Sequence, residues 1–166
     1  MGMSVIISVA TEQDAEQILK LQYLGYQSEA ELYGDWGIEP LTQTLESLRT
    51  ELGERHVLVA RLGDEVVGTV RGWTDEDGVG RIGRLVVHPR MQRHGLGGRL
   101  LDAIERRLLE EGPVEYFRLF TGHRSIGNLR LYARQGYAQT GAERVSGGLS
   151  FIALEKPVRN VLAATA

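Results

Sequence analysis

The sequence predicts an α/β (α+β) domain in which a mixed, mostly antiparallel sheet is flanked by helices. Short β-branched runs alternate with segments whose apolar residues recur at helical spacing, in the order β-α-α-β-β-β-α-β-α-β-β. Short glycine-containing turns join two pairs of strands, as in antiparallel hairpins. One strand-helix-strand unit, from Val79 to Thr121, instead requires a parallel crossover.

The N-terminal third begins with a predicted strand from Ser4 to Ala10. Thr11 then offers a helix N-cap, with Asp14 three residues later as its capping-box partner. From Gly25 to Glu39 the helical periodicity is lost, so we expect a loop rich in aromatic and acidic residues. A second helix is expected from Pro40 to Gly53. The apolar positions of the two helices are Ala15, Ile18, Leu19 and Leu21, and Leu41, Leu45, Leu48 and Leu52.

The rest of the chain alternates strands and helices more regularly. Gly63-Asp64 is a hairpin signal between two strands, and Pro89 ends the third strand because proline cannot donate to a central ladder. A second hairpin is expected around Ser146-Gly147-Gly148. The expected strands are 56–62, 65–73, 79–88, 114–121, 137–145 and 149–156, and the expected helices are 95–111 and 125–135.

Length and charge limit the organisation and the function classes. The 166 residues suffice for one domain with one sizeable core, which we place at residues 1–157, followed by a loosely held tail at 158–166. The formal net charge of -3 gives no global positive field, so neither nucleic acid nor a membrane surface is expected as a partner. No apolar run approaches the ~20 residues that span a bilayer. The N-terminus lacks the pattern of a secretory signal, and a cytoplasmic location is expected.

The chain contains no cysteine, which excludes disulfides, thiolate metal sites and a cysteine nucleophile. No pair of histidines has zinc-binding spacing, so no metal is expected.

The segment Gln92 to Gly98 carries the main functional signal. It follows a valine-rich strand and leads into an amphipathic helix. The first N–H groups of a helix lack intrahelical acceptors, and the helix dipole adds partial positive charge there. Glycines let the backbone approach an anion closely, so the pattern predicts a phosphate or pyrophosphate site. The residues of this candidate site are Gln92, Arg93, His94, Gly95, Leu96, Gly97, Gly98 and Arg99.

Two other phosphate-binding motifs fit this segment poorly. A Walker loop requires lysine and serine or threonine after its last glycine, whereas Arg99 and Leu100 follow Gly98. A dinucleotide fingerprint requires a third glycine where Leu100 stands. Its glycines should also follow the strand closely, but six residues separate His88 from Gly95.

Three segments together resemble the GNAT superfamily of N-acetyltransferases. Gln92, Gly95 and Gly97 match its phosphate signature Gln/Arg-x-x-Gly-x-Gly/Ala. The strand end at 85–89, Leu-Val-Val-His-Pro, and the segment at 128–132, Asn-Leu-Arg-Leu-Tyr followed by Gly-Tyr at 136–137, are also similar to that family. In element order the resemblance covers the chain from residue 5 to residue 156.

The resemblance implies a cofactor site and an acid. Acetyl-CoA would be the acyl donor, with its pyrophosphate on the amides of residues 93–98 and its pantetheine along Val86 and Val87 like an added strand. The Val87 N–H would then be an oxyanion donor for the thioester carbonyl. Asn128 would face the pantetheine or the thiol, and Tyr132 would protonate the departing thiolate. Both also have packing interpretations, Tyr132 as a core tyrosine and Asn128 as support for a helix cap at Ser125.

The same resemblance leads to an N-acetyltransferase that moves the acetyl group to a primary amine. Because the chain has no thiol to carry the acyl group, direct attack within a ternary complex is favoured over an acyl-enzyme. Glu39, His88, His123 or a chain of water molecules remain open as the general base. Tyr33, Trp36 and Glu39 lie in an acidic, aromatic stretch that suits a cationic amine.

Several alternatives remain open at this point. The expected partner is a small-molecule amine, and the family's frequent dimers allow a homodimer, whereas the acceptor's identity and the acyl-chain length are undetermined. The alternative function is a non-catalytic acyl-CoA-binding or sensing module on the same fold. A protein that binds a nucleotide or a sugar phosphate at the same anion site is a further alternative.

Overall fold

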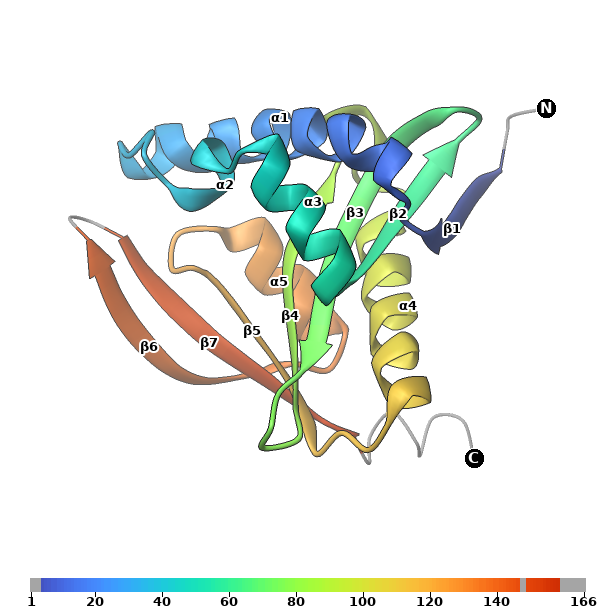
Figure 1. Ribbon diagram of the computed structural model, residues 1–166. Coiled ribbons are helices and arrows are strands. Elements are labelled where there is room, and N and C mark those ends of the chain that lie inside the picture. Colours follow the sequence, from blue (N-terminus) through green and yellow to red (C-terminus); the bar gives the residue numbers. More distant parts are fainter. Residues whose placement is uncertain (1–3, 147–148, 159–166) are drawn as a thin grey trace.

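A computed structural model of the chain describes residues 4–146 and 149–158. These residues build a seven-stranded sheet with the strand order β1-β2-β3-β4-β5-β7-β6. Every neighbouring pair is antiparallel except β4 and β5, which are parallel. Helices cover the sheet on both sides (Figure 1). The predicted fold class, the number and order of the strands and the parallel crossover are therefore confirmed.

The strands are β1 (Val5–Val9), β2 (His56–Leu62), β3 (Glu65–Thr74), β4 (Val79–Val87), β5 (Tyr116–Gly122), β6 (Ala138–Ser146) and β7 (Leu149–Pro157). The α-helices are α1 (Ala15–Tyr33), α2 (Glu39–Thr42), α3 (Leu45–Glu54), α4 (Leu96–Glu111) and α5 (Ile126–Arg134), and short 3₁₀ turns, η1 (Glu12–Asp14) and η2 (Pro89–Met91), precede α1 and α4.

The loop expected from Gly25 to Glu39 is wrong over its first half, because α1 continues to Tyr33. Glycine usually weakens a helix, but Gly25 lies where α1 crosses β4. A Cβ atom at this position would lie 2.4 Å from Cγ1 of Val86. The glycine therefore permits close packing of the helix on the strand instead of ending the helix. The helix ends at Gly34, whose φ of 64° is left-handed.

The single helix expected from Pro40 to Gly53 is also wrong, because two helices occupy this stretch. The four-residue α2 ends at Thr42, and α3 begins after Thr44. The Thr44 side chain accepts a hydrogen bond from the Ser47 N–H at 3.1 Å, as an N-cap does. Leucine spacing alone did not reveal this cap inside a continuous periodic pattern.

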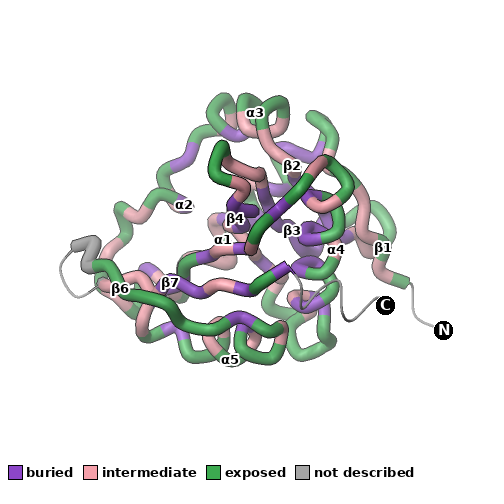
Figure 2. Tube along the Cα trace, turned by 90° about the horizontal axis from the view of Figure 1, so that it is seen from below, coloured by how far each residue is buried: buried purple, intermediate pink, exposed green. Residues whose placement is uncertain are grey.

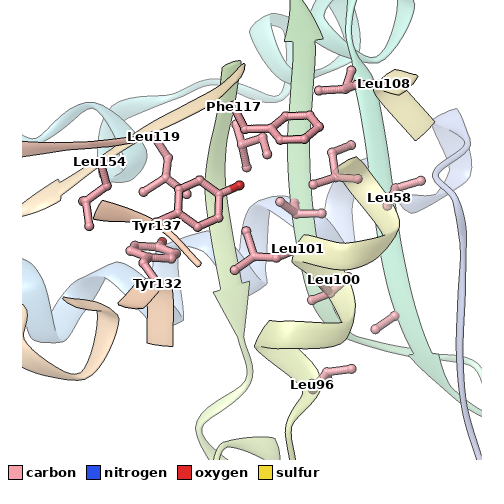
Figure 3. Close-up of a cluster of buried hydrophobic side chains, with 14 of the residues drawn as sticks. Leu58, Leu96, Leu100, Leu101, Leu108, Phe117, Leu119, Tyr132, Tyr137 and Leu154 are labelled. Carbon is pink, nitrogen blue, oxygen red and sulfur yellow. The ribbon is translucent and has the colours of Figure 1, made fainter. Parts of the chain in front are cut away.

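The sheet separates two hydrophobic clusters. Leu58 and Ala60 of β2 face α4, whereas Val57 and Val59 face α1 and α3, as expected for a strand buried on both faces. The larger cluster contains the apolar face of α4 and extends to Phe117, Leu119 and the tyrosines of the C-terminal third (Figure 3). Seen along the sheet, the buried positions concentrate on the central strands (Figure 2).

Strands β4 and β5 form a fork. Their parallel pairing comprises only three residue pairs and ends at Arg81 and Arg118. Beyond this point the strands diverge toward the α1 side of the molecule (Figure 1). The register between β3 and β4 shifts near the same place, and Arg84 has a φ of 53°, which is uncommon for a residue other than glycine. The fork and the irregular strand together leave backbone groups of β4 without a strand neighbour.

The C-terminal boundary expected at residue 157 falls at the end of β7. Val158 is buried, whereas residues 159–166 of the expected tail lie outside the described residues. The centre of the expected turn, Gly147-Gly148, also lies outside them. Within the described part of the chain, no helix is long and apolar enough to cross a membrane.

Candidate functional site

The fork between β4 and β5 opens into a cavity of about 660 Å³. Its walls come from regions that are distant in sequence: the second half of α1, the segment from Asp35 to Pro40, the end of α3, residues of β3, β4, β5 and β7, and the inner side of α5. Tyr132 and Asn128 of α5 line it, as do Tyr33 and Glu39. The structure thus brings together at one cavity the predicted acid and two of the three predicted acceptor residues.

The predicted phosphate loop lies at the N-terminus of α4, where β4 leaves the sheet. Within the described residues, the backbone N–H groups of residues 93–98 have no protein acceptor. The first α-type hydrogen bond of the helix runs from the Arg99 N–H to the Gly95 carbonyl at 3.2 Å. No side chain caps the helix. Six consecutive donors therefore meet the positive end of a 16-residue helix, as in an anion-binding site.

The glycines of this loop have different structural roles. Gly95 has a φ of 74° and is exposed, so it supplies the left-handed conformation that turns the chain into α4. Gly97 and Gly98 instead face α5. A Cβ atom on Gly97 would lie 2.9 Å from Leu131, and one on Gly98 would lie 2.6 Å from Gln135. The pattern Gly-x-Gly-Gly thus also permits α4 and α5 to pack closely beside the fork.

The strand before the loop presents backbone groups to the fork. The His88 N–H donates to the Val67 carbonyl of β3 at 2.8 Å. Because successive N–H groups of a strand point in opposite directions, the Val87 N–H points away from β3 and toward the fork. The Val87 carbonyl accepts a hydrogen bond from the Gln92 side chain at 3.3 Å, which ties the loop to the strand. The Val86 side chain is buried against α1, and its backbone pairs with Thr69 of β3, so among these two valines Val87 offers backbone groups to the fork.

Tyr132 is buried at the base of the cavity, and its ring packs edge-on against that of Tyr137 with 6.1 Å between centroids (Figure 3). Burial raises the pKa of Tyr132 well above its ordinary value, with smaller contributions from Tyr26 and Glu29. Burial also raises the pKa of Tyr26, another cavity residue, to about 12. Both phenols therefore remain protonated at neutral pH. Asn128 donates to the Thr121 hydroxyl at 3.3 Å, so its side chain is anchored on β5 and not on Ser125.

A hydrogen-bonded cluster joins α1 to the start of α5. The Tyr33 hydroxyl lies 3.0 Å from the Ser125 hydroxyl and accepts from the Arg124 N–H at 2.9 Å. The Ser125 hydroxyl donates to the Glu29 carboxylate at 3.0 Å. Burial raises the pKa of Glu29 above its ordinary value, and the hydrogen bond from Ser125 opposes this shift. Glu29 lines the cavity. Its carboxylate is therefore a further candidate for the general base, and the sequence analysis did not identify it.

The other predicted residues lie in different surroundings. Glu39 lines the cavity but is largely exposed, with its carboxylate 3.6 Å from the Arg84 guanidinium. Trp36 is 59% exposed and does not line the cavity. His88 and His123 also lie outside its lining. The His88 ring accepts from the Arg90 N–H at 3.2 Å, and the His123 Nδ1 lies 3.1 Å from the Ser150 carbonyl.

Arg71 is a buried cation in the lining of the cavity. Its guanidinium donates to Glu51 at 2.5 Å, to Gln22 at 2.5 Å and to Gln43 at 3.1 Å. These contacts join α1, α3 and β3, so Arg71 fixes the helices on the sheet. Burial lowers the pKa of Arg71, and the Glu51 carboxylate opposes this effect.

No group of three histidine, aspartate or glutamate side chains that could hold a metal ion occurs within residues 4–146 and 149–158. The cavity lining contains three phenols, Tyr26, Tyr33 and Tyr132, together with the Asn128 amide, carboxylates and arginines.

Comparison with solved structures supports the fold. A PaiA N-acetyltransferase from Thermoplasma acidophilum in complex with coenzyme A aligns with a TM-score of 0.76 at 18% identity, over 93% of this chain and 99% of the other. A putative acetyltransferase, yncA, from Salmonella typhimurium with acetyl-CoA aligns with a TM-score of 0.76 at 15% identity, over 93% and 94%. At these identities the similarity concerns the fold alone.

Sequence comparison identifies a family. A mycothiol acetyltransferase from Kineococcus radiotolerans is 36% identical over 123 residues, which are 63% of this chain and 39% of the relative. The chain thus matches well under half the length of that relative. The family model of the acetyltransferase (GNAT) family matches residues 16–137, which include nearly all of α1, the fork, the loop and α5. The chain belongs to the acetyltransferase (GNAT) family.

Proposed function

We propose that this protein transfers an acetyl group from acetyl-CoA to a primary amine by direct attack in a ternary complex, within one domain formed by residues 1–157. The observation that carries the proposal is the row of six backbone N–H groups without acceptors at the start of α4, beside a fork that leads to a buried tyrosine. The two solved relatives with coenzyme A or acetyl-CoA share the fold and support this choice of donor.

The loop would bind the diphosphate of the cofactor. Residues 93–98 supply backbone donors, and Arg93 and Arg99 add positive charge. Pantetheine would then extend along Val86 and Val87, on the side of β4 from which β5 has diverged. The Val87 N–H points into the same gap, so it is suited to stabilise the oxyanion that forms on the thioester carbonyl. Asn128, anchored on Thr121, would line the path of the thiol.

The reaction forms a C–N bond and breaks the C–S bond of the thioester. An ammonium acceptor first loses one proton to a base, and the free amine then attacks the carbonyl carbon. The tetrahedral intermediate expels the thiolate, to which Tyr132 donates its proton. The acetylated nitrogen gives its extra proton to water, and the Tyr132 phenolate regains a proton from water. Burial raises the pKa of Tyr132, so the phenol carries its proton and can donate a hydrogen bond to the departing thiolate and share that proton with it.

Glu29 is the base that the geometry favours. It lines the cavity together with Tyr132, and the hydrogen bond from Ser125 holds its carboxylate. The raised pKa of Glu29 makes it a stronger base than an exposed glutamate. Glu39 is more exposed, and neither His88 nor His123 lines the cavity, although water could connect each of them to the amine.

Release of free thiol from acetyl-CoA in the presence of a panel of amines tests the function. We expect Tyr132→Phe to lower kcat by roughly 10²-fold or more while the affinity for CoA stays within a factor of two. Tyr116→Phe is the matched control, since Tyr116 lies on β5 outside the cavity.

Two outcomes would contradict the proposal. If CoA binds but no amine releases thiol, the protein is the acyl-CoA-binding or sensing module instead. If ATP or NAD binds more tightly than CoA in calorimetric titrations, the anion site serves a nucleotide and the acetyltransferase assignment fails for this chain.

A further inference from the structure

The cavity has opposite charge character at its two ends. Glu29, Asp35 and Glu39 line the end formed by α1 and the segment after it. Arg84 also lines the cavity and offsets part of this negative charge, 3.6 Å from Glu39, whereas Arg71 is paired with Glu51. The closed end of the fork is lined instead by Arg55, Arg81 and Arg118, which we call the arginine row.

Strand register creates the arginine row. Trp73 of β3 pairs with Arg81 of β4, and Arg81 pairs with Arg118 of β5, so the three residues lie side by side across the sheet. Arg55 precedes β2 and stacks on the Trp73 ring, with its guanidinium carbon 3.4 Å from the ring centroid. Four residues from three strands and one helix terminus therefore form a continuous strip where the fork begins.

The carboxylates that neutralise part of the arginine row lie outside the cavity lining. Arg81 donates to Asp75 at 2.8 Å, and the Nε of Arg118 lies 3.5 Å from Glu155. Arg55 has no carboxylate partner within the described residues. The closed end of the cavity therefore carries a net positive charge.

Two members of the row also have unused donors. The Nη1 of Arg55 is buried and has no hydrogen-bond acceptor in the described part of the chain, and the buried Nε of Arg118 forms an ion pair with Glu155 at 3.5 Å but no hydrogen bond there. A buried donor without an acceptor costs free energy, and guanidinium groups bind carboxylates in planar, paired geometry. An anionic group at this end would offset the net positive charge. After small movements of the arginine side chains, it would also accept hydrogen bonds from their guanidinium N–H groups.

We propose that the acceptor substrate carries a carboxylate remote from its reacting amine, and that the arginine row binds this carboxylate. This inference rests on the proposed acetyl transfer. The amine would lie at the acidic end beside Glu29 and Tyr132, and the carboxylate would lie against Arg55 and Arg118. Along β4, Leu85 near the reaction centre lies four positions after Arg81, which corresponds to about 13 Å at the rise of a strand. Since the arginine side chains extend into the cavity, the two groups of the acceptor are roughly 8–12 Å apart.

The test compares acceptors that differ only at the end remote from the amine. Thiol release is measured with ω-amino acids from 4-aminobutanoate to 8-aminooctanoate, and with the n-alkylamines and ω-aminoalkyl phosphates of matching length. We expect kcat/KM to rise with chain length among the amino acids and to exceed that of the matched alkylamine roughly tenfold or more. Equal values for the amino acid and the alkylamine would overturn the carboxylate site while leaving acetyl transfer intact. A preference for the phosphate would overturn the assignment to carboxylate.

Variants then assign the preference to the arginine row. Arg55→Gln and Arg118→Gln should each reduce the ratio of kcat/KM for 8-aminooctanoate over octylamine roughly tenfold, mainly through KM. Arg49→Gln is the matched control, because Arg49 is exposed on α3 and does not line the cavity. An unchanged ratio in both cavity variants would contradict the proposal. If no amine is acetylated, calorimetric binding of 8-aminooctanoate to the CoA-loaded protein decides: binding weakened by Arg55→Gln supports the site, and undetectable binding refutes it.

Discussion

Gly122, where β5 ends and α5 approaches, provides a sharp test of how α1 closes the cavity. A Cβ atom at this position would lie 2.1 Å from the Tyr33 hydroxyl oxygen and 2.6 Å from the carbon that bears it. Tyr33 cannot retreat without breaking its contacts with Ser125 and with the Arg124 N–H. We therefore predict that Gly122→Ala destabilises the protein and weakens binding of the amine, but not of CoA.

The magnitude follows from the two ways to relieve this clash. Moving the ring breaks two hydrogen bonds worth about 1 kcal/mol each, whereas moving the backbone costs about 1–3 kcal/mol as overpacking does. Because the protein takes the less costly route, the loss is about 1–2 kcal/mol, which lowers Tm by roughly 2–8 °C for a domain of this size.

Thermal unfolding and steady-state kinetics provide the assay. Gly127→Ala is the control, because a Cβ atom at this exposed position of α5 meets nothing within 4 Å. Alanine should leave that helix unchanged or slightly more stable. If Gly122→Ala and Gly127→Ala melt at the same temperature, the described docking of Tyr33 is wrong. Combining Gly122→Ala with Tyr33→Ala should destabilise less than the sum of the single changes.

Three further predictions concern the loop and two carboxylates. Gly95→Ala places a side chain at a left-handed φ of 74°, so we expect a loss of about 1–2 kcal/mol in urea unfolding together with weaker CoA binding; unchanged values would contradict the loop geometry. The hydrogen bond from Arg61 is the main cause of the lowered pKa of Asp14, so Asp14→Asn should cost about 1–2 kcal/mol near pH 7. That difference should disappear as the pH falls below the ordinary value of 3.8 and through the folded-state pKa, and a constant difference in acid would refute the ion pair. Burial raises the pKa of Glu29, so its charge destabilises the fold once the pH exceeds 4.5; Glu29→Gln should then raise Tm at pH 7 but not at pH 4, and should abolish the rise of kcat/KM with pH. An unchanged pH profile for Glu29→Gln would show that another group is the base.

Local sequence patterns were sufficient to predict the sheet, the parallel crossover and the loop. The strand 79–88 followed by glycines and an amphipathic helix is a local signal, and it appears in the structure as β4, the loop and α4. The helix boundaries were predicted wrongly where a residue type can have either of two structural roles. Gly25 interrupts a helical pattern in the sequence, but its value lies in a contact with Val86, 61 positions away. Thr44 caps a helix within an unbroken leucine repeat.

The candidate site was only partly predictable for the same reason. Glu29 belongs to an acidic stretch in the sequence, and only its hydrogen bond with Ser125 and its position on the cavity distinguish it from Glu31. The arginine row depends on the register of strands that are far apart in the chain, so spacing along the sequence contains no sign of it. Long-range pairing is the information that local patterns lack.

Calorimetric titration of the protein with CoA and with pantetheine tests most directly whether the amides at the start of α4 bind a diphosphate. Pantetheine keeps the thiol arm but lacks the pyrophosphate and the nucleotide. The account predicts that CoA binds at least roughly 10²-fold more tightly, and that salt weakens the binding of CoA far more than that of pantetheine. Equal affinity for the two compounds, or no binding of CoA, would contradict it.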